Sequence, residues 1–292
     1  MRVLLFGATG QVGTALNTRL RGAVDQIVEL VTPSSAEVPL TDAAALEHYI
    51  EAQAPQVIVN AAAYTRVDDA EREPDVAFAV NGVAPGVMAR VAQRHGARMV
   101  HLSTDYVFDG TGSLPYGTEA TPSPVNVYGA SKLAGEEAVQ RACPTAAVVR
   151  TAWVHSGGGV NFVATAVRLL GAGTSMRVVD DQVGAPTHAD TLAESIMRLM
   201  HPAAAGGVLH VTDAGVASWY DVACCVLDTM RAHGRVADEV TVTPVASGAF
   251  PRPARRPVVS LLDTHATRQR LGFTPPHWRD GVMASTRQLL GL

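Results

Sequence analysis

Residues 3–13, VLLFGATGQVG, determine the fold expected for this chain. A short apolar run predicts a buried strand, and glycines at 7, 10 and 13 lead from it into the helical pattern of residues 11–21. Glycine lets the backbone approach a diphosphate, and the start of a helix offers free N–H groups and a positive dipole. A tight turn that needs glycine is the alternative interpretation. The residues predicted to hold a dinucleotide here are Gly7, Gly10, Gln11, Val12 and Gly13.

Apolar runs alternate with helical patterns over the first two hundred residues. The apolar runs are 3–6, 27–31, 57–59, 99–102 and 146–149, and a later run at 208–211 extends the series. The helical patterns are 11–21, 43–52, 75–94, 128–141 and 161–170. Unalternated strands between helices indicate a parallel sheet that is covered on both faces. We therefore predict an α/β fold with a Rossmann-type doubly wound parallel sheet, in which ligands bind beyond the carboxyl ends of the strands.

The pattern changes after residue 212. A helix is predicted at 219–231 and a strand at 240–243, followed by a Pro/Arg-rich segment and two short helices. This pattern predicts a smaller C-terminal substrate lobe. The expected division is a dinucleotide-binding Rossmann domain of residues 1–157 and 186–212, and a substrate-binding lobe of residues 158–185 and 213–292.

Composition narrows the class of protein. The chain has 292 residues, of which 47% are hydrophobic and 17% charged, as in a well-packed globular protein. A net charge of −4 argues against a general nucleic-acid binder. The cysteines form no disulfide framework, and no apolar run reaches membrane-spanning length, so we expect a cytoplasmic protein. We interpret the first apolar run as a buried strand and not a signal peptide, and the ten histidines show no metal-binding spacing.

The single lysine of the chain, Lys132, follows Tyr128 by four positions. On a helix, residues four apart lie on the same face, so the ammonium and the phenol point into the same space. A nearby cation favours the phenolate and lowers the pKa of tyrosine from about 10. The pair therefore predicts a tyrosine general acid near neutral pH, and an accidental pair on a helix surface is the alternative.

The residues that follow three of the predicted strands are candidates for ligand contacts. After the fourth, Thr104 can donate to a substrate carbonyl beside Tyr128, or it can cap the next turn. After the third, the small residues 60–63 leave room for a cofactor, or form a packed alanine loop. Within residues 29–35, no acid stands at the strand tip to bind ribose hydroxyls, and several hydroxyl side chains could hold a 2′-phosphate instead. This favours NADPH and leaves NADH possible.

Several strings together resemble the extended short-chain dehydrogenase/reductase family, and within it most closely the dTDP-4-dehydrorhamnose reductase family. The strings are GATGQVG (7–13), NAAAYTRVDDAE (60–71), STDYVFDG (103–110), YGASKLAGE (128–136), RTAWV (150–154), DDQVGAPT (180–187) and FPRPARRPVVSLLD (250–263). The first and fourth strings occur across the wider superfamily. STDYVFDG, RTAWV and the RPARRP string are more specific to sugar-nucleotide 4-ketoreductases.

This resemblance implies NAD(P)H-dependent reduction of the C4 ketone of a dTDP-4-keto-6-deoxyhexose. It implies that Tyr128 donates the proton, that Lys132 binds the nicotinamide ribose, and that Thr104 bonds the carbonyl or tunes the tyrosine. Further implied cofactor contacts are Leu40, Ala62, Ala63, Tyr64 and Thr65. Implied substrate contacts are Thr104, Asp105, Tyr106, Trp153 and Arg256. Ordinary core packing is the alternative for Trp153, and a solvated basic loop is the alternative for Arg252, Arg255 and Arg256.

The chain also departs from the family pattern. His155 stands where tyrosine is usual, and Pro39 stands where many relatives carry an acid near the adenosine. Ala15 stands where some relatives carry a magnesium-binding glutamate, so we expect no metal. Three other functions stay open: a 4-ketoreductase of another dTDP-deoxysugar, an NDP-sugar 4-epimerase that retains NAD, and a non-catalytic regulatory subunit. The expected assembly is a monomer or homodimer.

Overall fold

A computed structural model describes residues 1–22, 29–201, 204 and 206–292 of the chain. A six-stranded parallel sheet forms its centre, in the order β10-β5-β4-β3-β1-β2. The strands are β1 (Arg2–Phe6), β2 (Glu29–Val31), β3 (Val57–Asn60), β4 (Arg98–Thr104), β5 (Ala147–Thr151) and β10 (Gly207–His210). The predicted α/β fold is confirmed, and the run at 208–211 completes the sheet. The first two residues of the predicted strand 27–31 lie outside the described residues.

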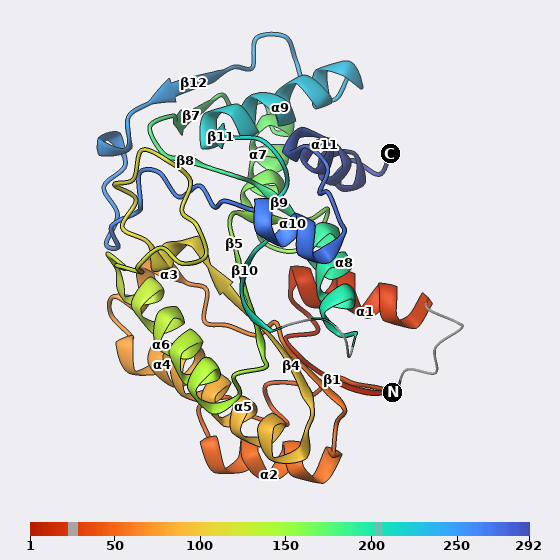
Figure 1. Cartoon of the computed structure of the whole chain (residues 1–292). Coiled ribbons are helices and arrows are strands. Elements are labelled where there is room, and N and C mark those ends of the chain that lie inside the picture. Colours follow the sequence, from red (N-terminus) through yellow and green to blue (C-terminus); the bar gives the residue numbers. More distant parts are fainter. Residues whose placement is uncertain (23–28, 202–203, 205) are drawn as a thin grey trace.

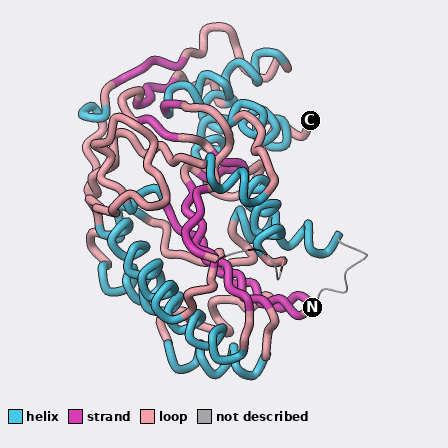
Figure 2. The backbone as a smooth tube through the Cα atoms, viewed as in Figure 1, coloured by secondary structure: helices cyan, strands magenta, loops and turns pink. Residues whose placement is uncertain are grey.

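Helices cover both faces of this sheet (Figures 1 and 2). On one face lie α2 (Ala43–Gln53), α4 (Pro74–Phe78), α5 (Ala84–His95) and α6 (Val127–Ala142); on the other lie α1 (Gln11–Gly22) and α8 (Ala189–Leu199). Each face has its own hydrophobic core, with Leu4 and Ile58 in one and Leu5 and Val59 in the other. Successive residues of β1 and β3 thus point to opposite faces, as expected of a doubly covered sheet.

The predicted single helix 75–94 is interrupted. Between α4 and α5 the chain forms one π-helical turn (Ala79–Val83), which inserts Asn81 toward α6. The Asn81 side chain accepts from Tyr64 N at 2.8 Å and donates to Ser131 Oγ at 3.0 Å. The prediction of a regular helix was wrong here because these buried hydrogen bonds stabilise a wider turn, as π-bulges at functional sites do.

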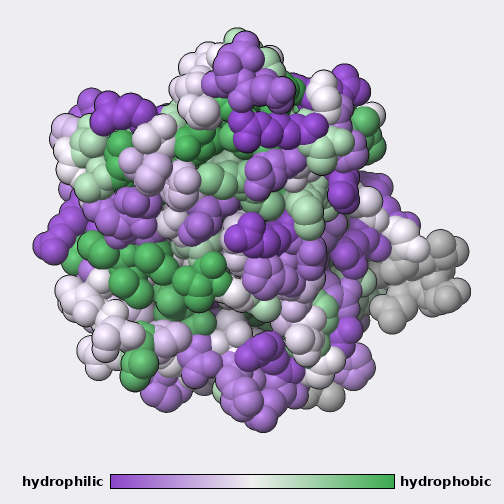
Figure 3. Space-filling model, turned by 90° about the horizontal axis from the view of Figure 1, so that it is seen from above, coloured by the Kyte–Doolittle hydropathy of each residue, from purple (hydrophilic) through white to green (hydrophobic). Residues whose placement is uncertain are grey.

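A smaller group of elements lies above the carboxyl edge of the sheet (Figure 1). Its core is formed by α7 (Phe162–Gly171), α9 (Trp219–Ala232) and α11 (Trp278–Leu289). Here β7 (Met176–Val179) pairs in parallel with β12 (Val242–Val245), which begins two residues later than predicted. Residues 162–179 therefore pack with the C-terminal residues. Seen from above, hydrophobic side chains gather on one part of a mostly polar surface (Figure 3).

The remaining elements are short. They are α3 (Val67–Ala70), β6 (Val154–His155), β8 (Val183–Gly184), β9 (Thr187–His188), β11 (Ala217–Ser218), α10 (His265–Leu271), and the 3-10 turns η2 (Asp105–Val107) and η3 (Ser247–Ala249). β6 pairs with β9, and β8 pairs with β11. None of the helices in the described ranges combines the length and apolarity needed to cross a bilayer.

Candidate active site

A cleft of about 680 Å³ opens where β1, β3, β4 and β5 end. The strand order reverses between β1 and β3, and such a switch point is where ligands bind in open α/β sheets. Predicted site residues that line the cleft are Gly7, Gly10, Gln11, Val12, Ala62, Ala63, Thr65, Thr104, Asp105, Tyr106, Tyr128, Lys132 and Trp153. Lining residues that the sequence analysis did not assign to a ligand are Thr9, Ala61, Val67, Leu102, Ser103, Thr151, Val154, Gly159, Val160 and Trp219.

The glycine-rich loop closes tightly against the end of β3. Gly7 has φ +80°, and a Cβ on it would lie 2.5 Å from Ala62 N. A Cβ on Gly13 would strike the carbonyl of Gly7, so Gly13 brings α1 close to β1 without lining the cleft. The backbone is thus exposed beside the start of α1, where free N–H groups and the helix dipole favour an anion. These residues fit the diphosphate of a dinucleotide cofactor.

Three other predicted contacts lie outside the lining of the cleft. Tyr64 is buried, and its hydroxyl donates to Glu73 Oε2 at 2.6 Å. Leu40 packs against a hydrophobic core. Arg256 donates to Asp68 Oδ1 at 2.6 Å, and Arg252 lies 3.8 Å from the same carboxylate. Asp68 thus lies between Arg252 and Arg256, and a diphosphate contact by Arg256 stays a prediction.

Tyr128 and Lys132 both reach the cleft from the first turns of α6. Asn126 caps this helix by accepting from Gly129 N at 2.7 Å. Lys132 is 2% exposed, and its Nζ donates to the Leu102 carbonyl at 2.6 Å. Burial lowers the pKa of Lys132 to about 8, and the nearby Glu136 carboxylate opposes that shift.

The expected direction of the shift in the Tyr128 pKa was wrong. Burial raises the pKa of Tyr128 to about 12, the Asp105 carboxylate adds to the rise, and a hydrogen bond with Thr104 opposes it. Desolvation disfavours the phenolate more than the partners of Tyr128 favour it. The raised pKa keeps the phenol protonated near neutral pH. Lys132 directs its ammonium to the Leu102 carbonyl.

Thr104 and Asp105 form a buried pair at the end of β4. The Thr104 hydroxyl donates to Asp105 Oδ1 at 3.0 Å and accepts from Tyr106 N at 3.2 Å. Thr104 therefore caps the following 3-10 turn, as one of its two interpretations predicted. Burial raises the pKa of the Asp105 carboxyl to about 6, against hydrogen bonds from Ser260 and Thr104. Asp105 Oδ2 is buried and has no partner in the described part of the chain.

A buried ion pair lies one further turn along α6. Glu136 accepts from Arg150 Nη2 at 2.7 Å and Nε at 3.0 Å, and Ser103 Oγ donates to the same carboxylate. Both charged side chains are at most 4% exposed. Tyr128, Lys132 and Glu136 thus share one face of the helix, at successive i+4 positions. The i+4 spacing could have identified Glu136. Its partner Arg150 lies on β5, and no local spacing connects the two residues.

Two indoles stack at one wall of the cleft. The rings of Trp153 and Trp219 lie 3.7 Å apart with an interplanar angle of 7°. Trp153 has φ +48°, and a Cβ on Gly184 would lie 2.6 Å from its ring. Core packing alone does not describe Trp153, because it lines the cleft. Trp219 was missed because nothing in the sequence pairs the start of the helix 219–231 with the end of β5.

The chain resembles known proteins over its whole length. The profile of the family described as RmlD substrate binding domain matches residues 1–290. A dTDP-4-dehydrorhamnose reductase of Burkholderia thailandensis is 41% identical over 300 residues, with 99% of each chain covered. The crystal structure of a dTDP-4-dehydrorhamnose reductase of Clostridium acetobutylicum has a TM-score of 0.91 at 34% identity, with both chains fully covered. That of Bacillus anthracis, in complex with NADP, has a TM-score of 0.88 at 32% identity, covering 100% of this chain and 99% of its own.

These matches confirm the resemblance on which the sequence interpretation relied. They extend across both the sheet and the smaller group of elements above it, so no part of the described fold stands apart from the relatives. The chain therefore belongs to the RmlD substrate binding domain family.

Proposed function

We propose that this chain is an NADPH-dependent oxidoreductase that reduces dTDP-4-dehydro-L-rhamnose to dTDP-L-rhamnose. The observation that carries the proposal is the convergence of Tyr128, Lys132 and Thr104 on one cleft with the glycine-rich loop. The names of the relatives support the substrate, and the NADP complex of one of them supports the cofactor. Among the described residues, no group of His, Cys, Asp and Glu side chains has metal-binding geometry. The proposed reaction needs no metal ion.

A nicotinamide cofactor bound beside the glycine-rich loop would supply the hydride for C4 of the sugar. Tyr128 holds the proton that the C4 oxygen needs, since the raised pKa keeps its phenol protonated. Proton transfer breaks the O–H bond of Tyr128 and forms the product hydroxyl, which leaves a phenolate that is reprotonated from solvent. The buried ammonium of Lys132 stabilises that phenolate from the same face of the helix.

Thr104 orients the carbonyl oxygen beside Tyr128 in this mechanism. A hydroxyl has one proton, and Thr104 donates it to Asp105 Oδ1. Donation to a substrate oxygen follows if Asp105 is protonated and becomes the donor to Thr104. The raised pKa of Asp105, about 6, makes its protonated form accessible.

The elements above the sheet are proposed as the substrate side of the cleft. Trp219 lines the cleft from these elements, and Tyr106 and Trp153 line it from the segments that follow β4 and β5. We propose the division 1–157 with 186–212 for the cofactor, and 158–185 with 213–292 for the sugar nucleotide. The packing of α7 against α9 and α11 supports that division. Assembly as a monomer or homodimer stays a prediction.

A direct assay tests this function. Purified protein is mixed with NADPH or NADH and dTDP-4-keto-6-deoxyglucose, with and without a 3,5-epimerase, and cofactor oxidation is followed by absorbance. Oxidation only with the epimerase present, faster with NADPH, supports the proposed reaction. Oxidation without the epimerase indicates another dTDP-deoxysugar as product. Absence of oxidation in both mixtures contradicts the proposal and favours a regulatory role, whereas NAD retained through purification favours a 4-epimerase.

A further inference from the structure

The side chain of Gln11 leaves the glycine-rich loop and reaches the substrate side of the cleft. Its Oε1 accepts from Asn161 Nδ2 at 2.9 Å and lies 3.1 Å from Ser156 Oγ. Its Nε2 donates to the Val154 carbonyl at 3.4 Å. A residue of the proposed cofactor site thus bonds to a segment about 150 positions away, and the amide is engaged by protein at both ends.

The bonded segment, residues 156–160, contains three consecutive glycines. Gly159 has φ +71°, and the following Val160 is 97% exposed although it lines the cleft. Glycine loses more conformational freedom on ordering than any other residue, so this segment is costly to fix. A Cβ on Gly157 would strike the side chain of Gln288 on α11, so the segment contacts both parts of the molecule.

Asn161 joins this segment to α7. Its Oδ1 accepts from Ala164 N at 2.8 Å and caps the helix, while its Nδ2 donates to Gln11 Oε1 and to the carbonyls of Ser156 and Gly158. The two ends of one amide therefore serve different purposes. An aspartate at this position keeps the cap and loses the donor to Gln11 and to the Ser156 and Gly158 carbonyls.

We propose that Gln11 is a positioning residue that couples cofactor binding to substrate binding, an inference that rests on the proposed function. A diphosphate bound to the glycine-rich loop fixes the first turn of α1, and with it the Gln11 amide. The amide then orders residues 156–161 before the sugar nucleotide arrives. The glycines then lose their conformational entropy when the cofactor binds. The sugar nucleotide no longer bears that cost, so it binds more tightly. By reciprocity, the sugar nucleotide tightens the cofactor by the same factor.

The test is binding, not turnover. Calorimetry measures the Kd of dTDP with and without saturating NADP⁺ for the parent, Gln11→Met and Asn161→Asp. We expect NADP⁺ to tighten dTDP by about fivefold or more in the parent, in the usual range of coupling between sites. Both variants should bring that ratio close to one. Met retains the length of the side chain, and Asp retains the cap of α7, so either variant can carry the test if the other does not fold.

Gln288→Met is the matched control. Like Gln11→Met, it replaces a glutamine that lies beside the glycine segment, but this glutamine belongs to α11 and not to the cofactor site. The effect of NADP⁺ on the Kd of dTDP should therefore stay at the parent value. A parent protein without coupling, or Gln11→Met and Asn161→Asp proteins that keep it, would overturn the proposal. Failure of dTDP to bind the parent at all would overturn the proposed function too, whereas tight dTDP binding with unaltered coupling overturns only the role of Gln11.

Discussion

The indole of Trp153 lies flat on that of Trp219, with the ring centroids 3.7 Å apart, although Trp153 lies between β5 and β6 and Trp219 begins α9. Phe162 packs edge-on against Trp219 at 5.0 Å, and Gly184 leaves no room for a side chain beside Trp153. The Trp153 indole is thus held between neighbours while it lines the cleft. Its position depends on residues from three separate elements.

Trp219→Leu should raise the KM for the sugar nucleotide by about tenfold, the equivalent of about 1.4 kcal/mol of lost contact and ordering. Trp153 has φ +48° and stacks on Trp219, so without that partner its ring should no longer be confined to one position. The far-ultraviolet circular dichroism couplet of the two stacked indoles should disappear together with the tight binding. Trp278→Phe is the control, since Trp278 is buried and bonds Val216 away from the cleft. An unchanged KM in Trp219→Leu would refute the positioning role.

The alkaline limb of kcat/KM should reflect Lys132. Its pKa is lowered to about 8 by burial, so above that pH the ammonium is lost and the rate should fall. Lys132→Arg keeps the charge at all accessible pH values and should remove the limb. Its rate should also be lower throughout by about two orders of magnitude, because the guanidinium fork does not fit the site of an ammonium bonded to Leu102 O. A limb that persists in Lys132→Arg would assign that titration to another group.

Glu136→Gln should destabilise the fold by about 3–5 kcal/mol, because it leaves the buried Arg150 guanidinium without its counter-charge. Adding Arg150→Met should recover part of that loss, since the pair is then replaced by groups that need no counter-charge. Urea unfolding measures both effects. Arg94, which pairs with Glu47 and Glu51 at the surface, is the control: Arg94→Met should cost less than about 1 kcal/mol. A cost as small for Glu136→Gln would mean that Arg150 is reached by solvent.

Acid should weaken the fold through His155. Burial lowers its pKa to about 3, and the His188 ring adds to the shift. The unfolded chain, with a pKa of about 6.5, then binds more protons than the native protein between these two values. Stability from this residue is therefore fully present above about pH 6.5 and is lost as the pH falls, by up to about 1.4 kcal/mol per pH unit.

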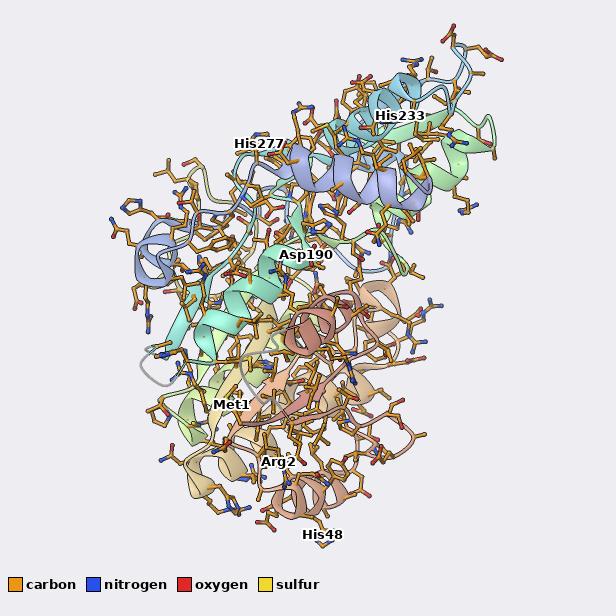
Figure 4. All side chains as sticks on the ribbon, turned by 90° about the vertical axis from the view of Figure 1, so that its right-hand side faces the viewer. Met1, Arg2, His48, Asp190, His233 and His277 are labelled. Carbon is orange, nitrogen blue, oxygen red and sulfur yellow. The ribbon has the colours of Figure 1, made fainter. Side chains whose placement is uncertain are left out.

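His155→Phe should flatten that slope of unfolding free energy against pH, whatever its effect on absolute stability. His48→Gln is the control, because His48 is an exposed residue of α2 at the lower end of the molecule in Figure 4. Identical slopes for the parent and His155→Phe would show that the ring is not buried as a neutral group.

Hydrophobic periodicity was enough to predict the sheet and most of its helices. The apolar runs have the length of buried strands, and the glycines at 7, 10 and 13 leave few alternatives to a loop between β1 and α1. The π turn at Asn81 escaped prediction because its cause is a set of hydrogen bonds to Tyr64 and Ser131, which are close only in the folded chain. Local sequence patterns do not predict contacts between residues that are distant in the sequence.

The candidate site was predicted less completely. Spacing on one helix placed Tyr128 and Lys132 in one cleft, and the ends of β1, β3 and β4 supplied other lining residues. Trp219 and the segment after β6 were missed, because tertiary packing brings them there from distant positions. The Tyr128 shift was wrong in sign because the sequence shows the neighbouring cation but not the extent of burial.

The most direct test of the account is the turnover of Tyr128→Phe with the keto-sugar substrate, measured beside its affinity for NADP⁺. Removing one hydroxyl leaves the ring and its edge-on contact with Tyr106 in place. The account predicts a kcat at least about a hundredfold below the parent, as for loss of a general acid, with little change in the Kd of NADP⁺. A variant that turns over at the parent rate would contradict the assignment of Tyr128 as proton donor.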